Sequence, residues 1–575
     1  MRFVSDKRIS ISLCCEDNDC IPDSIVFNDQ ISSDGQAIAN TFNSYFQSVF
    51  EIDTRVTVGE TNSSSEYNLC VNNVNITCEI IEKYLLKLDH SKGSGPDKLH
   101  PIFLKRCSSQ ISVPLHILFS KSLHSGSLPH IWKRSIIVPV HKSGDKRNVK
   151  NYRGISKLSV IPKLLEKIIY DNLFPLIRPR LIPQQHGFIN KRSTETNLCE
   201  FIDIVLYAMN CGYQVDVIYT DFSKAFDKIS HSLLIDIIKQ AGIHGDLLRW
   251  LESYLRDRTQ AVAVRGFTSS FVPITSGVPQ GSHLGPLLFN IFLNDIVQSF
   301  QHSQSLLYAD DAKIFKIIRE REDCTKLQMD LVNFDKYCTS NELFLNLDKC
   351  CVISFCRKKS PILFDYMIRN RNILRVSVVK DLGVLLDAGL LFDKHIVNII
   401  GKAFKMLGFI FRQGSDFKDI RTFNLLYNSY VRSYLEYASP VWNPQYDKYI
   451  FAIESVQNKF LRRLLYKFKL DDAQNLNILS LRKRRGYRDQ IFLYKLLHNL
   501  IDSNYLLSNI HIKCPSFSAR SRDTFYISAR KTNYAKNCFL LRSCRAYNNY
   551  FSDIDIFHNN IKQFSRRIID KIHLK

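Results

Sequence analysis

The sequence has no apolar run long enough to cross a lipid bilayer. Its longest largely apolar stretches, such as 287–293, fall well short of the roughly 20 residues that a transmembrane helix needs. No apolar stretch of signal-peptide length follows the charged N-terminus. We therefore expect an intracellular protein with no membrane partner, and the sequence does not decide between nucleus and cytoplasm.

The sequence also lacks the paired cysteines of a zinc site or of a disulfide framework. Its 16 cysteines are spread over 575 residues, and the nearest approach to a motif, Cys14 and Cys15 with Cys20, has no second pair to match it. We interpret most of these cysteines as free thiols.

Acidic residues are few relative to basic ones. There are 55 Asp and Glu against 78 Lys and Arg, which gives a formal net charge of +23. Such an excess favours phosphate contacts, so nucleic acid is the first partner to consider. From charge alone, a basic protein without such a partner is an equal alternative. Hydrophobic residues make up 45% and charged residues 23%, values typical of a folded globular protein.

The two ends of the chain differ from its middle. Residues 1–75 are mostly polar and linker-like, with one helix predicted near 38–50 because Ile38, Phe42 and Phe46 recur at four-residue spacing. From about residue 398 the strand patterns fade and helical stripes take over. A basic run, 482–485, follows; such runs are typical of nucleic-acid contact and of nuclear import alike.

The middle of the chain mixes helix and strand patterns, which indicates an α+β fold with antiparallel pairing. The predicted elements are, in order, a helix over 193–212, a strand over 215–220, a helix over 225–240, a hairpin over 306–315, a helix around 327–338 and a strand over 351–355.

Three carboxylates fall where strands end. Asp221 follows the strand predicted over 215–220, and Asp310 and Asp311 lie at the centre of the predicted hairpin. Mg²⁺ prefers carboxylate oxygens, and two such ions about 3.5 to 4 Å apart can neutralise the charge of a phosphoryl-transfer step. A pair of Asp residues alone is more typical of a solvated turn. The flanking residues are what favour a metal site.

Three motifs occur in a fixed order in this region. Residues 220–227 read TDFSKAFD, residues 276–282 read SGVPQGS and residues 308–311 read YADD. Each motif is several residues long, and their order and spacing are constrained as well. Together they resemble the catalytic core of reverse transcriptases.

The resemblance extends in both directions and covers roughly residues 80–470. The flanking segments resemble the polymerase of non-LTR (LINE-type) retrotransposons, and of the jockey-like group in particular. These segments are 95–101 (GPDKLHP), 137–145 (IVPVHKSGD), 151–156 (NYRGIS), 185–188 (QHGF), 346–350 (NLDKC), 380–384 (KDLGV), 430–437 (YVRSYLEY) and 441–444 (VWNP).

The resemblance implies a catalytic set. Asp221, Asp310 and Asp311 would be the catalytic carboxylates and the metal ligands for two Mg²⁺ ions, with Mn²⁺ as an alternative. Lys349 would assist the departure of pyrophosphate.

The resemblance also implies a set of substrate-binding residues. Lys142 and Arg153 would hold the triphosphate, Arg153 by paired hydrogen bonds and Lys142 as a point charge, with an ordinary surface lysine as the alternative for Lys142. Phe226 would lie under the incoming sugar and exclude a 2′-hydroxyl, with a plain core role as the alternative. Gln280 and Gly281 would belong to the loop that packs against the incoming nucleotide, where glycine permits close backbone approach.

The fold implied by the resemblance is that of a right-hand polymerase. We expect a linker-like segment over 1–75, fingers and an antiparallel palm over 76–395, a helical thumb over 396–470 and a basic C-terminal region over 471–575. The implied substrates are an RNA template, a DNA primer and deoxynucleoside triphosphates. Protein partners, template and target-site specificity and oligomeric state are not implied.

The sequence departs from the family at its start. The N-terminal endonuclease of intact family members is not recognisable, so we expect a chain that lacks it, and the sequence does not decide whether an endonuclease is supplied in trans. The main hypothesis is an RNA-directed DNA polymerase. The alternative is a catalytically inactive, retrotransposon-derived nucleic-acid-binding protein, against which the complete set of Asp221, Asp310 and Asp311 argues.

Overall fold

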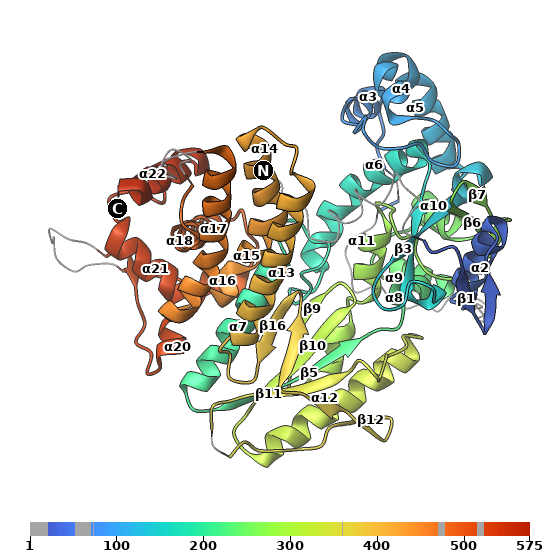
Figure 1. Cartoon of the computed structure of the whole chain (residues 1–575). Helices are drawn as coiled ribbons and strands as arrows, with labels where there is room; N and C mark the ends of the chain where they lie inside the picture. The colour runs from blue at the N-terminus through green and yellow to red at the C-terminus, as the bar shows by residue number, and fades with distance from the viewer. Residues whose placement is uncertain are drawn as a thin grey trace. The chain divides into compact units, whose positions relative to one another are not determined.

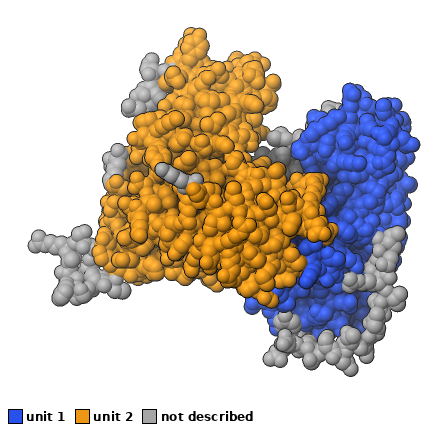
Figure 2. Space-filling model, turned by 90° about the horizontal axis from the view of Figure 1, so that it is seen from below, with its two compact units in different colours: residues 1–183, 222–298, 334–346 blue, residues 184–221, 299–333, 347–575 orange. Residues whose placement is uncertain are grey.

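The computed structural model describes residues 21–51, 71–72, 74–358, 360–469, 478–513 and 523–574 (Figure 1). Two compact units, coloured separately in Figure 2, are each built from three stretches of sequence. Unit 1 takes Met1–Pro183, Phe222–Gln298 and Phe334–Asn346, and unit 2 takes Gln184–Asp221, Ser299–Asn333 and Leu347–Lys575. Both units contain helices and strands, which confirms the predicted mixed class, while the predicted domain boundaries stay predictions. Among the described helices, none has the length and apolar character that crossing a membrane requires.

Unit 1 is built around a five-stranded sheet in the order β4-β3-β6-β7, with β8 also paired to β6. β3 and β4 are antiparallel, whereas β3 and β6 are parallel. The strands are β3 (Arg134–His141), β4 (Tyr152–Lys157), β6 (Arg258–Val264), β7 (Phe267–Thr268) and β8 (Val272–Ile274). The helices of this unit include α3 (Cys78–Leu86), α4 (Pro101–Arg106), α5 (Ser108–His124), α6 (Val160–Ile177), α10 (Gly245–Leu255) and α11 (Gly285–Phe292).

The helix expected near 38–50 is present as α2 (Gly35–Gln47), after a short hairpin of β1 (Ile25–Phe27) and β2 (Gln30–Ser32). Asp34 caps it, since its carboxylate accepts hydrogen bonds from the backbone N–H groups of Gln36 and Ala37. Its apolar stripe is buried with residues of β3, β4 and β6 in one hydrophobic cluster. This part of the predicted linker-like segment therefore belongs to the core of unit 1.

The helix predicted over 225–240 is wrong in one respect, because the structure divides it into α8 (Ala225–Lys228) and α9 (His231–Gln240). Ile229 and Ser230 are extended, and Ser230 caps α9. The carbonyls of Phe226 and Ile229 accept hydrogen bonds from the N–H groups of Val278 and Gly277. A continuous helix would need those carbonyls for its own hydrogen bonds.

Unit 2 contains the second five-stranded sheet, in the order β14-β11-β5-β10-β9. All its neighbours are antiparallel except β11 and β14. The strands are β5 (Gln214–Asp221), β9 (Gln304–Tyr308), β10 (Asp311–Ile318), β11 (Cys351–Phe355) and β14 (Leu374–Arg375), so the predicted strands and hairpin are confirmed. The helix expected around 327–338 is confirmed within the longer α12 (Arg321–Ser340).

The helix predicted over 193–212 is confirmed as α7 (Thr194–Asn210), and it covers one face of the sheet of unit 2 (Figure 1). Ser193 and Thr196 form a reciprocal capping box at its start. Leu198, Phe201 and Val205 of α7 share a hydrophobic cluster with alternate residues of β5, β10 and β11. Alternation is expected because successive strand residues point to opposite faces of a sheet.

The rest of unit 2 is mainly helical, after a hairpin of β15 (Val378–Asp381) and β16 (Val384–Asp387). Small β-pairs are β12 (Met367–Ile368) with β13 (Arg371–Asn372), and β17 (His511–Ile512) with β18 (Phe525–Tyr526). The helices are α13 (Asp393–Gln413), α14 (Ile420–Leu426), a π-helical stretch Tyr427–Arg432, α15 (Ser433–Glu436), α16 (Ser439–Trp442), α17 (Asp447–Phe468), α18 (Leu481–Leu497), α19 (Asn504–Ser508), α20 (Asn533–Lys536), α21 (Phe539–Tyr550) and α22 (Ile561–Leu574).

The basic run 482–485 lies at the start of α18 and is not a uniformly exposed patch. Arg484 forms an ion pair with Glu436, and Arg485 is fully buried with its Nε donating to Asn443. Two of the four basic side chains thus serve the interior of unit 2.

We expect the stability of unit 2 to depend on pH through His395 in α13. Burial lowers its folded pKa to about 4, below the value of about 6.5 for an unfolded histidine. Between these values the unfolded chain binds one more proton, so the free energy of unfolding falls by about 1.4 kcal/mol per pH unit as pH decreases. Urea unfolding at pH 7, 6 and 5 would measure this slope.

The matched variant is His395→Gln, because a glutamine oxygen can still accept the hydrogen bond that the Leu385 N–H donates to Nδ1 at 3.2 Å. Glutamine does not titrate in this range, so the variant should show a shallower slope. An identical slope in both proteins would contradict the assignment to His395.

Candidate functional site

The turn between β9 and β10 brings two of the predicted catalytic carboxylates to the end of the sheet. Asp311 lies opposite Tyr308, so Ala309 and Asp310 alone form the turn. Ala309 has a φ of +57°, a left-handed conformation that is uncommon for a residue with a side chain. Such conformations persist where the surroundings hold them in place.

The pairing of β10 with β5 brings in the third carboxylate. Asp311 and Asp221 are directly opposite each other in the antiparallel register. Opposite residues of antiparallel strands point to the same face, with Cβ atoms about 4.5–5.5 Å apart. The structure therefore brings Asp221 and Asp311 together, with Asp310 adjacent in the turn.

This face changes from apolar to charged along the strands. Val217 and Phe315 are opposite each other and are buried under α7. The next opposite pair on the same face is Tyr219 with Lys313, and it lies between the apolar pair and the pair of Asp221 with Asp311. Lys313 Nζ lies 2.5 Å from Asp381 Oδ2, and the hydroxyl of Tyr219 donates to the same carboxylate at 3.1 Å. The side chains of Lys313 and Asp381 are only 4% and 6% exposed.

Lys313 is a charged residue of the site that the sequence reasoning missed. Burial lowers its pKa, while the negative charges of Asp381 and Asp311 act in the opposite direction. A buried ammonium needs a paired anion, so Asp381 is required to keep this positive charge below Asp311. The signal in the sequence was a lysine within the otherwise mostly apolar strand 311–318.

Lys349 contacts the carboxylate set directly. Its Nζ lies 2.6 Å from Asp221 Oδ2, and its side chain remains 64% exposed. The ammonium therefore neutralises part of the charge that three neighbouring carboxylates concentrate. The structure thus brings all four predicted catalytic residues to one end of the sheet of unit 2.

The donor chemistry of this end of the sheet suits a hard divalent cation, because the three groups are carboxylates. Within the described residues, however, no three side chains among His, Cys, Asp and Glu are gathered into a ready-made metal site. The two paired strands fix the backbones of Asp221 and Asp311 opposite each other on the same face of the sheet.

The remaining predicted site residues lie in unit 1, where the loop 276–282 contacts the segment after Asp221. Gly277 has a φ of +81°, and a Cβ there would come within 2.6 Å of the carbonyl oxygen of Phe226. Gly281 has a φ of +120°, and a Cβ there would come within 2.8 Å of the carbonyl oxygen of Ser156. Both positions therefore require glycine, and at Gly281 the close neighbour is Ser156, while the predicted approach to a nucleotide stays a prediction.

Asp227 is the centre of a charged cluster in unit 1. Gln280 Nε2 donates to its Oδ1 at 2.6 Å, and Ser276 Oγ donates to its backbone carbonyl at 2.7 Å. Burial raises the pKa of Asp227, while the hydrogen bond from Gln280 and the positive charges of Lys224, Arg153 and Lys142 oppose that rise.

Among the predicted substrate-binding residues, Gln280 thus contacts the Asp227 carboxylate directly, and the charges of Lys142 and Arg153 act on its pKa. Lys142 and Arg153 come from β3–β4: Arg153 pairs with Val140 in the hairpin, and the N–H of Lys142 donates to the carbonyl of Asn151 at 2.8 Å. The sequence reasoning missed Asp227, although it lies within the quoted motif.

Phe226 is partly buried and stacks on Phe289 of α11, with ring centroids 4.1 Å apart and ring planes 13° from parallel. The stacking fixes the plane of the Phe226 ring. It is compatible with either predicted role, a wall for the sugar or a core residue.

Lys224 is a second residue that the sequence reasoning missed. Its φ is +54°, and its Nζ lies over the ring of Tyr45, 4.3 Å from the centroid. Burial lowers the pKa of Lys224 to about 8, Asp227 opposes that change, and neighbouring lysines, among them Lys142, add to it. An excess of positive charge at close range is the electrostatic signature of an anion site.

Residues 140–411 match the family of reverse transcriptases (RNA-dependent DNA polymerases). All nine predicted site residues fall within this range. This stretch is a reverse transcriptase domain. The domain draws on both units, since residues 140–411 include the sheets of each.

Two relatives show which reverse transcriptases the chain resembles. The RNA-directed DNA polymerase from mobile element jockey of Drosophila melanogaster is 30% identical over 336 residues, which cover 56% of this chain and 36% of the relative. The probable RNA-directed DNA polymerase from transposon X-element of the same species is 26% identical over 397 residues, covering 67% and 43%. The chain thus spans less than half the length of these relatives. The predicted resemblance to jockey-like retrotransposon polymerases is confirmed.

Among solved structures, a telomerase from Candida albicans in complex with a fragment of telomeric RNA aligns over 67% of this chain and 66% of its own. Its sequence identity is 12% and its TM-score 0.32. A TM-score at this level is too low to establish a shared fold.

We expect anion binding by the cluster around Asp227 to weaken as pH rises through about 8. Lys224 loses its charge near that pH, whereas arginine stays charged. Titration of the protein with tripolyphosphate at pH 7 and pH 9 should show a larger loss of affinity, roughly three- to tenfold, in the wild type than in Lys224→Arg. Equal pH dependence in the two proteins would show that Lys224 does not contact the anion.

Proposed function

We propose that this chain is an RNA-directed DNA polymerase that adds deoxynucleotides to the 3′-hydroxyl of a primer. The observation that carries the proposal is the direct pairing of Asp221 with Asp311, beside Asp310, within a reverse transcriptase domain. An inactive nucleic-acid-binding protein is the alternative, and the intact carboxylates with their supporting ion pairs favour the enzyme.

Asp221, Asp310 and Asp311 would hold the divalent ions, which are two Mg²⁺ or alternatively Mn²⁺. When bound, such ions neutralise the charge on the attacking and leaving oxygens. Lys349 lies on the same carboxylate set and would provide a mobile positive charge for the pyrophosphate, because its side chain is exposed. Buried Lys313, held by its ion pair with Asp381, would place an ammonium group on the same face as Asp311.

The cluster of unit 1 would bind the triphosphate. Arg153, Lys142 and Lys224 supply positive charge, and Asp227 limits their mutual repulsion before the substrate arrives. Gln280 is held by Asp227 and Gly281 by its close approach to Ser156, so the loop would present a fixed surface to the nucleotide.

The larger parts of the chain would follow the polymerase plan. We propose that the sheet of unit 2 is the palm, that the β3–β4 hairpin belongs to the fingers and that the helices α13 to α17 form the thumb. Lys459, Arg462 and Arg463 are exposed on α17, whereas Phe460 and Leu464 are buried, so one face of this helix is available for phosphates. The implied partners are an RNA template, a DNA primer and deoxynucleoside triphosphates.

We expect the double variant Asp310→Asn, Asp311→Asn to lose primer extension by roughly a thousandfold or more, because it removes two charged ligands from the metal site. The measurement is extension of a DNA primer on an RNA template with Mg²⁺ and deoxynucleotides.

The matched control is Glu320→Gln, Glu322→Gln, which removes the same charge from exposed side chains of unit 2. This control should extend primers as the wild type does. Binding of RNA by the wild type without any extension would support the inactive alternative instead.

We expect Phe226→Val to admit ribonucleotides. If the ring lies under the sugar, its loss should reduce the preference for deoxynucleotides, measured as a ratio of kcat/KM, by roughly 10- to 200-fold. Phe226→Tyr keeps a ring that can stack on Phe289 and should preserve the preference. If Phe226 is only a core residue, both variants will discriminate as the wild type does.

A further inference from the structure

The turn that carries Asp310 is held by a buried glutamine outside the predicted site set. Gln185 Oε1 accepts hydrogen bonds from the N–H of Ala309 at 2.9 Å and the N–H of Gly187 at 2.8 Å. Its Nε2 donates back to the carbonyl of Ala309 at 3.3 Å. Gln185 is 2% exposed, so water does not compete for these bonds. One side-chain amide thus satisfies both backbone groups of the left-handed residue in the turn.

The segment that carries Gln185 fits closely against β9. The N–H of Leu307 donates to Gln184 O at 3.0 Å, and the N–H of His186 donates to Leu307 O at 2.9 Å. A Cβ at Gly187 would come within 2.2 Å of the backbone nitrogen of Ala309. Because no space separates Gly187 from Ala309, a displacement of this segment would also displace the turn.

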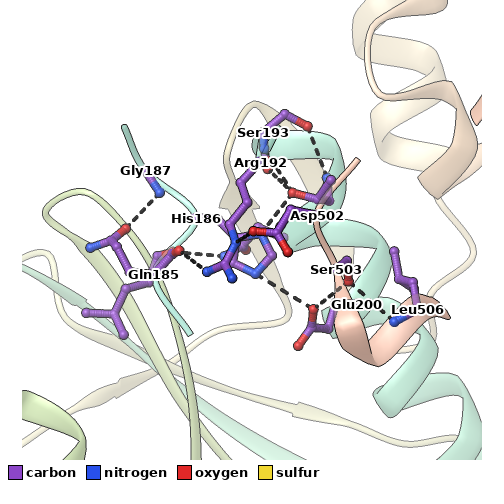
Figure 3. Close-up of polar contacts among 12 residues, drawn as sticks. Gln185, His186, Gly187, Arg192, Ser193, Glu200, Asp502, Ser503 and Leu506 are labelled. Carbon is purple, nitrogen blue, oxygen red and sulfur yellow. Dashed lines mark hydrogen bonds and ion pairs between the residues drawn. The ribbon is translucent and has the colours of Figure 1, made fainter. Parts of the chain in front are cut away.

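The segment is held in turn by Arg192 (Figure 3). Arg192 Nη1 donates to the carbonyl of Gln185 at 2.8 Å, and its Nε donates to Asp502 Oδ2 at 2.9 Å. The side chains of Arg192 and Asp502 are 12% and 13% exposed. This ion pair is therefore largely shielded from water, where charge-assisted hydrogen bonds are strong and directional.

Asp502 is itself fixed by its neighbours. Its backbone N–H donates to the carbonyl of Lys191 at 3.0 Å. The next residue, Ser503, caps α19 and donates to Glu200 of α7 at 3.1 Å. Two consecutive residues after α18 therefore attach to the segment that precedes α7 and to α7 itself.

We propose that Asp502 is a positioning residue for catalysis, which acts through Arg192 and Gln185 to hold Ala309 and hence the carboxylates of Asp310 and Asp311. The inference rests on the proposed polymerase function and extends it. Asp502 lies 91 positions beyond the end of the family match at residue 411, so the C-terminal region contributes to the chemical step as well as to any binding of nucleic acid.

The decisive variant is Asp502→Asn, which keeps the shape of the side chain and removes the charge that orients Arg192. We expect kcat for primer extension to fall about tenfold, while KM for deoxynucleotide and the affinity for primer–template change less than twofold, because only the carboxylate turn is disturbed. Asp502→Glu keeps the charge and should recover part of the lost kcat.

The matched control is Glu195→Gln. Glu195 and Arg488 form a similarly shielded ion pair at 2.6 Å between α7 and α18, with exposures of 23% and 18%. Arg488 also lies 3.9 Å from Glu436 of α15. Loss of the Glu195 ion pair should lower the melting temperature about as much as Asp502→Asn does, without changing kcat. An equal fall in kcat in both variants would show that any weakening of this interface slows the enzyme, and would overturn the proposal.

A second variant tests whether Asp502 acts through Gln185. If Asp502 acts through Gln185, the double variant Gln185→Leu, Asp502→Asn should lose no more kcat than Gln185→Leu alone. Losses that multiply would show that the two residues act separately, which contradicts the proposal.

Hydrogen exchange provides a readout that does not require activity. The Ala309 amide should exchange faster in Asp502→Asn than in the wild type, and at the wild-type rate in Glu195→Gln. A wild type without extension would refute the proposed function, whereas unchanged exchange and unchanged kcat in Asp502→Asn would refute only the positioning role.

Discussion

The antiparallel register of β5 and β10 is the constraint on which the candidate site depends. It places Asp221 opposite Asp311. On the same face, the neighbouring pair is Tyr219 of β5 opposite Lys313 of β10. A slip of one residue would turn every side chain of β10 to the other face and separate the carboxylates. The buried apolar pairs farther along these strands, such as Val217 with Phe315, oppose that slip because they would lose their contact with α7.

Charge balance is the second constraint, and each unit solves it differently. In unit 2, carboxylates dominate the end of the sheet, and Lys349 and buried Lys313 offset them. In unit 1, cations dominate around Asp227, and its partly buried carboxylate offsets them. Each cluster therefore retains a net charge opposite in sign to that of its proposed ligand. That ligand is a metal ion in unit 2 and a triphosphate in unit 1.

Sequence reasoning succeeded where a feature depends on neighbours in the chain. The helix with its cap at Ser193 and the turn at Asp310 follow from local patterns. It failed where distant residues decide: the break at Ile229 depends on the N–H of Gly277, and the partner of Lys313 lies 68 positions away. Arg192 and Asp502, 310 positions apart, could not be paired from spacing alone.

The alternation of the two units along the sequence has a consequence for dividing the chain. Unit 1 needs residues 334–346 to be complete, and the last strands and helices of unit 2 come later still. Neither unit can therefore complete its internal contacts from one contiguous stretch of the chain. Cutting the gene at any single point would leave at least one unit divided between two polypeptides.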